Sequence, residues 1–374
     1  MSYSAVIGQA ETISLLHQFV EQDRLPHALL LVGPKGCGKL ALAITAAQQL
    51  LCENKTETGD ACGRCRACIK SHKLIHPDLH FSFPTVGTNV TSDTYLGAWR
   101  EALLDNPYLN INQWLQLIGA ENKQGNINKQ ECNAIIKKLS LKTFENNYKV
   151  LIMWLPEFLG KEGNRLLKII EEPPANTHFI LVAERTELIL NTILSRCQLV
   201  KVTALSDKEV IAGLQQKGVG SLEEAQQIAY LANGNFNEAL SLMKRQQANE
   251  TEEFLAWLRL CYQGNGIKIV NWVNTFAKKG REPQKLFFQY ALHFLREYFI
   301  LKTDAGLRLR LQEAEIKTAE NLKKIIAIEQ IEAMMELFSE SIYYIERNAN
   351  PKVLLLDTSL QLNQILKMPK TVSA

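Results

Sequence analysis

Residues 28–40 read Ala-Leu-Leu-Leu-Val-Gly-Pro-Lys-Gly-Cys-Gly-Lys-Leu, and this stretch decides the fold. Its first part, Ala28–Val32, is apolar and has the length of a buried strand. Gly33–Lys39 has the spacing G-x-x-x-x-G-K, and the Ala- and Leu-rich residues 40–51 predict a helix. A strand, a glycine-rich loop and a helix in this order are typical of a phosphate-binding loop, or P-loop.

The candidate nucleotide-binding residues are Gly33, Gly36, Gly38 and Lys39. Glycines let the loop turn its N–H groups toward an anion, and both the helix N-terminus and the lysine add positive charge. The next residue, Leu40, lacks the hydroxyl with which Ser or Thr holds Mg²⁺ in the complete motif. We therefore expect a P-loop fold without Mg²⁺. ATP binding is doubtful, because the loop can also be a glycine-rich turn that never meets a nucleotide.

Length and composition narrow the class of protein. The chain has 374 residues, which is room for two or three domains. A net charge of +3 does not indicate a nucleic-acid binder, so any DNA contact has to rest on a local patch. We expect neither a membrane span nor a secretory signal. Of the eight cysteines, four cluster in a pattern suited to metal, which favours a reducing, cytoplasmic location.

Apolar runs and amphipathic segments alternate over the first 200 residues. Beyond the first strand, we expect strands at 79–83, 150–154, 179–182 and 199–202, and helices at 10–22, 127–142 and 165–172. This alternation predicts an α/β domain with a largely parallel sheet that is covered on both faces. Residues 84–126 carry no chemical motif, and we interpret them as an insertion with helices at 97–104 and 113–120.

The pattern becomes purely helical from Ser206 onward. Residues 206–209 (S-D-K-E) and 221–224 (S-L-E-E) each predict a capped helix start. The polar stretch 244–252 predicts a linker, and the amphipathic helices after it break at 264–266, 280 and 348–351. The expected domains are an α/β domain at 1–203, a small helical module at 204–245 and an all-helical domain at 246–374.

The clustered cysteines Cys52, Cys62, Cys65 and Cys68 have the spacing C-x9-C-x2-C-x2-C. Two residues between cysteines let one turn aim both thiolates at a common point, and four thiolates make a closed, structural zinc site. In the alternative interpretation, Cys52 belongs to the core and His72 or His76 completes the site. The basic residues around the cluster form either a modest patch or an ordinary solvated surface; they are Arg64, Arg66, Lys70, His72 and Lys73.

The second half of an ATP-hydrolysing site is missing. Such a site has Asp-Glu at the end of a core strand, where Asp handles Mg²⁺ and Glu orients the attacking water. Trp154 and Leu155 stand at these places, and Ala183 stands near the place of a polar sensor. Glu157 lies beyond the strand, where we interpret it as surface charge. Together with Leu40, these residues predict no intrinsic ATP hydrolysis.

Ser195-Arg196-Cys197 comes just before the last expected strand. An arginine at a sheet edge can reach the γ-phosphate bound by a neighbouring subunit and stabilise the transition state in trans. Taken alone, an arginine such as Arg196 is more often part of a structural salt bridge.

Several motifs together closely resemble bacterial DNA polymerase III clamp-loader subunits. They are L-K-I-I-E-E-P-P at 167–174, T-I-L-S-R-C at 192–197, the four-cysteine module and N-A-N-P-K at 348–352. The resemblance covers the chain apart from 84–126. It implies an AAA+ fold with a five-stranded parallel sheet, a helical lid and a helical collar that assembles a pentamer. It also implies membership of the DNA polymerase III holoenzyme, with the other clamp-loader subunits (gamma/tau and delta), the sliding clamp and primer–template DNA as partners.

Motor subunits of that family keep the P-loop Ser/Thr, the Asp-Glu pair and an arginine in the lid. This chain has Leu40, Trp154-Leu155 and Asn237 at those positions, whereas Ser195-Arg196-Cys197 remains. The resemblance therefore implies a non-hydrolysing subunit whose Arg196 completes the ATP site of a neighbour. Two alternatives stay open: an active gamma/tau-type ATPase subunit, and a zinc-dependent DNA-binding protein on an inactive NTPase scaffold. The second needs a denser basic or aromatic surface.

Overall fold

The computed structural model describes residues 3–22, 24–121, 123–219, 221–243, 250–303, 309, 311, 313–322 and 326–367. Contacts divide the chain into two compact units, Met1–Met243 and Lys244–Ala374, which we describe separately. Residues 244–249 of the expected linker, and with them the expected boundary at 245/246, lie outside the described residues. The rest of that stretch is helical, because a helix begins at Glu250.

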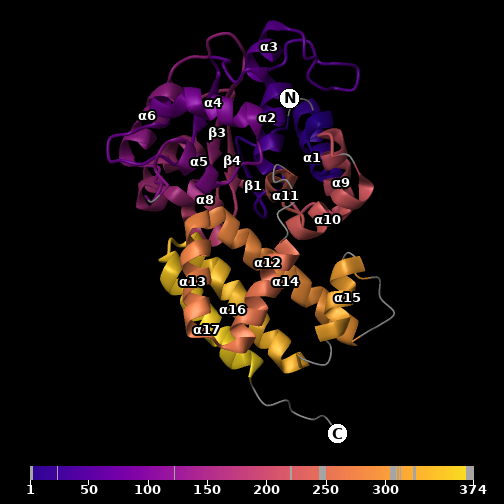
Figure 1. The fold of residues 1–374 in the computed structure, drawn as a ribbon. Helices are drawn as coiled ribbons and strands as arrows, with labels where there is room; N and C mark the ends of the chain where they lie inside the picture. The colour runs from indigo at the N-terminus through magenta and orange to yellow at the C-terminus, as the bar shows by residue number, and fades with distance from the viewer. Residues whose placement is uncertain are drawn as a thin grey trace. The chain divides into compact units, whose positions relative to one another are not determined.

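Strands and helices alternate in the first unit, as the sequence predicts (Figure 1). The strands are β1 (Ala28–Val32), β2 (Leu79–Ser82), β3 (Lys149–Trp154), β4 (Thr177–Ala183) and β5 (Gln198–Lys201). The helices are α1 (Ala10–Glu21), α2 (Lys39–Leu51), α3 (Arg66–His72), α4 (Leu96–Asp105), α5 (Ile111–Leu117), α6 (Lys129–Ser140), α7 (Leu167–Glu171), α8 (Asn191–Leu194), α9 (Asp207–Gln216), α10 (Leu222–Ala232) and α11 (Phe236–Met243). The helix expected from residue 165 begins at Leu167, since Pro156–Leu166 forms 3-10 turns.

The five strands form one parallel sheet in the order β2-β3-β4-β1-β5. With the P-loop directly after β1, this is the arrangement of an AAA+ domain. Both faces of the sheet are buried along β1, β3 and β4, and alternate residues of each strand face opposite ways. In β1, for example, Leu29 and Leu31 belong to one core cluster and Leu30 to another.

The two faces of the sheet have different covers. Side chains of α6, the turns at 156–166, α7 and α8 fill the cluster on one face. The other cluster contains side chains of α1, α2, the 84–126 segment and α9–α11. Figure 1 shows α9 and α10 beside α1 in the first unit. The P-loop and the three helices after the sheet thus share one hydrophobic core.

The three-helix module α9–α11 begins as its sequence predicts. Ser206 and Glu209 form a capping box at the start of α9. The hydroxyl of Ser221 accepts a hydrogen bond from the Glu224 N–H at the start of α10. Asn233, with φ 47°, ends α10 in a left-handed conformation, so that α11 turns back toward the P-loop.

The described part of the second unit is helical. Its helices are α12 (Glu250–Gln263), α13 (Gly266–Phe276), α14 (Arg281–Thr303), α15 (Glu313–Leu322), α16 (Ile328–Glu346) and α17 (Pro351–Leu366). The predicted breaks at 264–266, 280 and 348–351 are confirmed. Residues 309, 311, 326 and 327, which flank α15, are also non-helical, although no break was predicted there. None of the described helices is both long and apolar enough to cross a membrane.

Aromatic side chains build the core of the second unit. Trp257 and Phe254 are fully buried and contact rings of α14 and α16. The apolar run on α14 also belongs to this core, with Leu286, Phe287, Phe288, Tyr290 and Leu292 all no more than 8% exposed. These residues are therefore part of the unit's own core and do not offer a surface to other chains.

Candidate functional site

The glycine-rich loop makes the expected turn between β1 and α2. Gly36 and Gly38 have φ values of 67° and 98°, which favour glycine. Position 33 needs glycine because the backbone of Val202 passes close to it: a Cβ atom at Gly33 would lie 2.0 Å from the carbonyl oxygen of Val202. The loop thus has P-loop geometry. Its backbone conformation and close packing are enough to explain why glycine is needed at these positions, whether or not a ligand binds.

Lys39 is directed at its own loop. Its Nζ donates a hydrogen bond to the carbonyl oxygen of Pro34 at 2.5 Å and lies 3.7 Å from Sγ of Cys37. The residue is only 6% exposed. A P-loop lysine binds the β- and γ-phosphates, so Lys39 would first have to leave Pro34. The adjacent Leu40 is buried in the hydrophobic core, where it offers no ligand for Mg²⁺.

The turn between α10 and α11 lies directly on the loop. A Cβ atom at Gly36 would be 1.7 Å from Oδ1 of Asn235. The N–H of Phe236 also donates a hydrogen bond of 3.0 Å to the Gly36 carbonyl oxygen. Asn237, where the resemblance places the lid arginine of motor subunits, is 2% exposed. The three-helix module therefore contacts the P-loop through Asn235 and the backbone of Phe236.

Hydrophobic side chains fill the end of β3. Trp154 is 4% exposed and Leu155 is 2% exposed. The Trp154 ring lies 5.0 Å, centroid to centroid, from Trp99 of the 84–126 segment. The places of the two catalytic carboxylates are thus occupied by core side chains.

Glu157 is not a surface charge, contrary to the sequence-based interpretation. Its Oε1 accepts hydrogen bonds from the N–H groups of Glu184 and Arg185, directly after β4. Its Oε2 is buried and has no hydrogen-bond partner among the described residues. Burial raises the pKa of this carboxyl group. Glu157 thus joins the end of β3 to the end of β4.

The structure brings Cys52, Cys62, Cys65 and Cys68 together. Their four Sγ atoms lie within 4.8 Å of one another, so the cluster can hold one metal ion. Cys52 follows α2, Cys65 caps α3 and Cys68 lies within α3. Three of the sulfur atoms accept a hydrogen bond from the backbone N–H of the next cysteine in the cluster. Cys62 donates to Cys52 Sγ, Cys65 to Cys62 Sγ and Cys68 to Cys65 Sγ, each at 3.3 Å.

These N–H groups favour thiolates, which are the metal-binding form of cysteine. The backbone N–H of Arg64 lowers the pKa of Cys62 to about 6. Burial raises the pKa of Cys52 and of Cys68, so these two thiols need a cation nearby to lose their protons. A divalent ion at the centre of the four sulfur atoms would supply that charge.

Histidine is not part of this cluster. Among the residues that the structure describes, the metal-competent group contains only the four cysteines. His76 is 2% exposed, and its Nδ1 accepts a hydrogen bond from the N–H of Asp78 at 3.1 Å. Within the nearby basic patch, Lys70 is already paired with Glu145.

Arg196 and the P-loop lie at opposite ends of the parallel strands. It comes two residues before β5, whereas the P-loop follows the end of β1, and β1 and β5 are parallel. Its Nε donates to Oε2 of Glu171 at 3.0 Å, and its NH1 donates to the carbonyl oxygen of Thr192 at 2.8 Å. The side chain remains 31% exposed. Arg196 is thus held outward, and it cannot serve its own P-loop.

The strand order and the P-loop define an AAA+ protein whose magnesium-binding and catalytic positions hold apolar residues. A family described as "DNA polymerase III, delta subunit" matches residues 8–206, which is more than half of the 374 residues. The chain belongs to this family, in agreement with the resemblance seen in its motifs.

Curated relatives include more than one kind of DNA polymerase III subunit. DNA polymerase III subunit delta' of Bacillus subtilis is 28% identical over 74% of this chain and 74% of its own length. Subunit delta' of Escherichia coli is 26% identical over 60% of this chain and 57% of its own. Subunit gamma of Buchnera aphidicola subsp. Acyrthosiphon pisum is 24% identical over 64% of this chain and 57% of its own.

Proposed function

We propose that this chain is a non-hydrolysing, delta'-type subunit of the DNA polymerase III clamp loader, and that Arg196 completes the ATP site of a neighbouring subunit. The relatives include both delta' and gamma subunits, so the choice between them rests on the site. One contrast supports the delta'-type assignment. Apolar residues replace the magnesium-binding and catalytic groups at the end of the strands that carries the P-loop, while Arg196 is retained at the other end.

The surroundings of Arg196 suit a function in trans. Its partner Glu171 is 56% exposed, and an exposed pair of this kind contributes only about 0–1 kcal/mol. Arg196 can therefore exchange Glu171 for a phosphate at little cost. The planar guanidinium can bind two γ-phosphate oxygens at once, which a lysine cannot do. Glu171 meanwhile keeps the side chain oriented before the neighbour arrives.

The remaining assignments follow from this function. The α/β domain is 1–203, the lid is 204–245 and the collar is 246–374. The four cysteines bind one structural zinc ion, because four thiolates close its coordination shell. The partners are the gamma/tau and delta subunits, and through the complex the sliding clamp and primer–template DNA.

The isolated chain is expected to show no ATP turnover, because Leu40, Trp154 and Leu155 can neither bind Mg²⁺ nor orient water. The measurement is steady-state phosphate release by the purified protein, with Lys39→Ala as the control for a contaminating ATPase. The protein is then added to the motor subunits, whose turnover should rise. Turnover by the chain alone that is lost in Lys39→Ala would identify an active motor subunit. Tight DNA binding without any effect on the motor subunits would favour the DNA-binding alternative.

Exposed apolar residues of the second unit are expected to contact sister subunits. Ile267 on α13 is 77% exposed and Val353 on α17 is 66% exposed. Ile267→Asp and Val353→Asp should weaken assembly with the other subunits at least 10-fold without lowering the Tm, and removal of residues 245–374 should abolish it. Leu117→Asp, at a residue that is 62% exposed in the first unit, is the control. Analytical ultracentrifugation measures the outcome, and unchanged assembly of the truncated chain would refute the collar assignment.

A further inference from the structure

We propose that the 84–126 segment is a built-in occupant of the degenerate nucleotide site, and that its Asn106 and Tyr108 hold the three-helix module α9–α11 against the P-loop in place of a nucleotide. The contacts that carry this role lie within the first unit and do not depend on what Arg196 does.

The segment is part of the core. Its two ends are joined by hydrogen bonds between Thr85 and Asn126, with N–O distances of 2.9 and 2.8 Å. Trp99 of α4 and Trp114 of α5 are fully buried, and their ring centroids lie 5.0 Å apart. The indole N–H of Trp114 donates to the carbonyl oxygen of Pro84 at 2.8 Å. A segment anchored in this way cannot leave the sheet without exposing two tryptophans.

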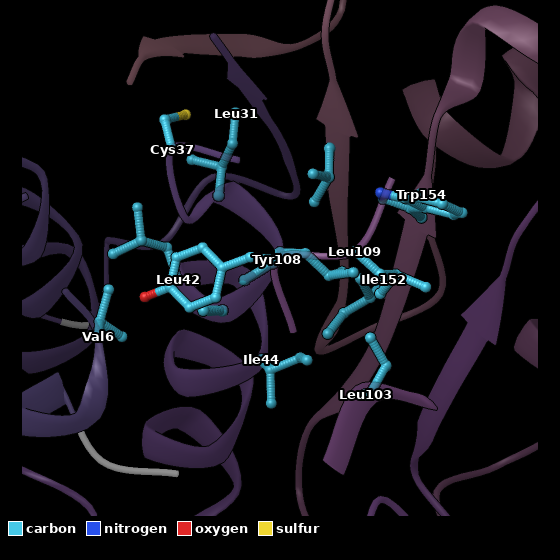
Figure 2. Packing of buried hydrophobic residues seen from close by; sticks show 14 of the residues in the cluster. Val6, Leu31, Cys37, Leu42, Ile44, Leu103, Tyr108, Leu109, Ile152 and Trp154 are labelled. Atoms are coloured by element: carbon cyan, nitrogen blue, oxygen red, sulfur yellow. The ribbon is translucent and has the colours of Figure 1, made fainter. Parts of the chain in front are cut away.

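Tyr108 lies between α4 and α5 and is 7% exposed. Its ring carbon would be 3.2 Å from a Cβ atom at Gly38, directly over the loop. Its hydroxyl accepts a hydrogen bond from the N–H of Ile7 at 2.9 Å, and its ring lies edge-on to Phe236 of α11 at 5.0 Å. Figure 2 shows Tyr108 among the buried side chains, between Val6 and Leu109 in that view. One side chain thus contacts the N-terminal segment, the P-loop and the three-helix module.

Asn106 adds a polar connection to the module. Its Nδ2 donates a hydrogen bond of 2.7 Å to Oδ1 of Asn237, which is buried on α11. Its own Oδ1 accepts from the N–H of Tyr108 at 3.0 Å, so the turn and the side chain support each other. The bond to Asn237 satisfies a polar group that would otherwise be costly to bury.

The two side chains that carry these contacts, Asn106 and Tyr108, have no charge. A phosphate group would attract Lys39, whereas the phenol of Tyr108 does not, and Lys39 Nζ instead donates to Pro34. When a free ligand stabilises one conformation of a protein, the population of that conformation depends on the ligand concentration. A covalently attached occupant has a fixed, high effective concentration. The module should therefore stay in one position whether or not ATP is present.

Hydrogen exchange of the full-length protein tests this inference. KM values rarely exceed about 1 mM, so ATP at about 5 mM would fill an ordinary nucleotide site. Exchange in peptides covering 33–39 and 236–243 should nevertheless be unchanged. Asn106→Ala should speed exchange in 236–243 about 3- to 10-fold, as expected for one lost hydrogen bond. Tyr108→Ala should speed exchange in both peptides. Neither variant should change exchange in β3, which reports on the fold of the sheet.

Leu117→Ala is the matched control, because Leu117 belongs to the same segment but is 62% exposed. Its exchange should equal that of the unmodified protein. The Asn106→Ala/Asn237→Ala double variant should exchange no faster in 236–243 than the faster of the single variants, since both lose the same bond. Protection of 33–39 by ATP in the unmodified protein would show that the segment leaves the site and would overturn the inference. Unchanged exchange of 236–243 in Asn106→Ala and Tyr108→Ala would also overturn it.

Discussion

Arg196→Ala is expected to slow ATP hydrolysis at one site of a reconstituted clamp loader by about 10³–10⁵-fold, the contribution that an arginine finger makes in GTPases. The loss follows from the removal of the positive charge that stabilises the transferring phosphoryl group. A loader has several ATP sites, so total turnover should fall only in part. The measurement is clamp- and DNA-stimulated phosphate release, together with the rate of clamp loading.

Three controls separate catalysis from structure. The Arg196→Ala protein should remain folded, metal-loaded and assembled, because its only described ion pair is the exposed one with Glu171. Arg196→Lys should rescue poorly, since lysine lacks the planar fork. Glu171→Ala should retain most of the activity, because it removes the resting partner of Arg196 and leaves the guanidinium in place. Clamp loading at the unmodified rate by Arg196→Ala would show that this arginine is structural.

Cys65→Ser is expected to release the metal and to lower the Tm of the protein by about 10 °C. Structural zinc couples its binding energy to folding, and each kcal/mol lost shifts the Tm of a unit of this size by about 2–4 °C. Metal analysis of the unmodified protein should find about one zinc ion per chain, since four thiolates saturate one tetrahedral ion. Acid should release the ion as well, because protons compete for the thiolates as the pH falls.

Cys132→Ser is the control for the zinc prediction. Cys132 is a buried cysteine of α6 that lies outside the cluster, so this variant should keep its zinc even if the core is weakened. Metal-free protein that melts at the same temperature as the metal-loaded protein would show that the four cysteines are not a structural zinc site.

The strands of the sheet could be predicted from sequence because each is a short apolar run with a clear boundary. β1 has the predicted bounds, since the glycine-rich loop ends it, and β3 begins one residue earlier than predicted. The cysteine cluster was found for a similar local reason: three of its members lie within seven residues and the fourth ends the preceding helix. Local spacing was sufficient in both cases.

The contacts of the 84–126 segment could not be predicted, because they join residues that are far apart in sequence. Tyr108 bonds to Ile7, which is 101 residues away, and Asn106 bonds to Asn237, which is 131 residues away. Neither pair leaves a periodic pattern. Glu157 was misinterpreted for the same reason, since the N–H groups that hold its carboxylate follow a different strand.

The apolar run on α14 shows another limit. Amphipathic spacing identifies the buried face of a helix but not which chain buries it. Leu286 and Phe288 pack in the core of their own unit, whereas the most exposed large apolar residues described in that unit, Ile267 and Val353, lie on α13 and α17. Only the structure separates these two kinds of apolar surface.

Arg196→Ala and Lys39→Ala are best compared in the same reconstituted loader, with stimulated ATP turnover as the measurement. If this chain contributes to hydrolysis through its arginine and not through its own P-loop, Arg196→Ala lowers turnover while Lys39→Ala leaves it unchanged. A fall with Lys39→Ala and unchanged turnover with Arg196→Ala would show instead that the chain acts through its own P-loop.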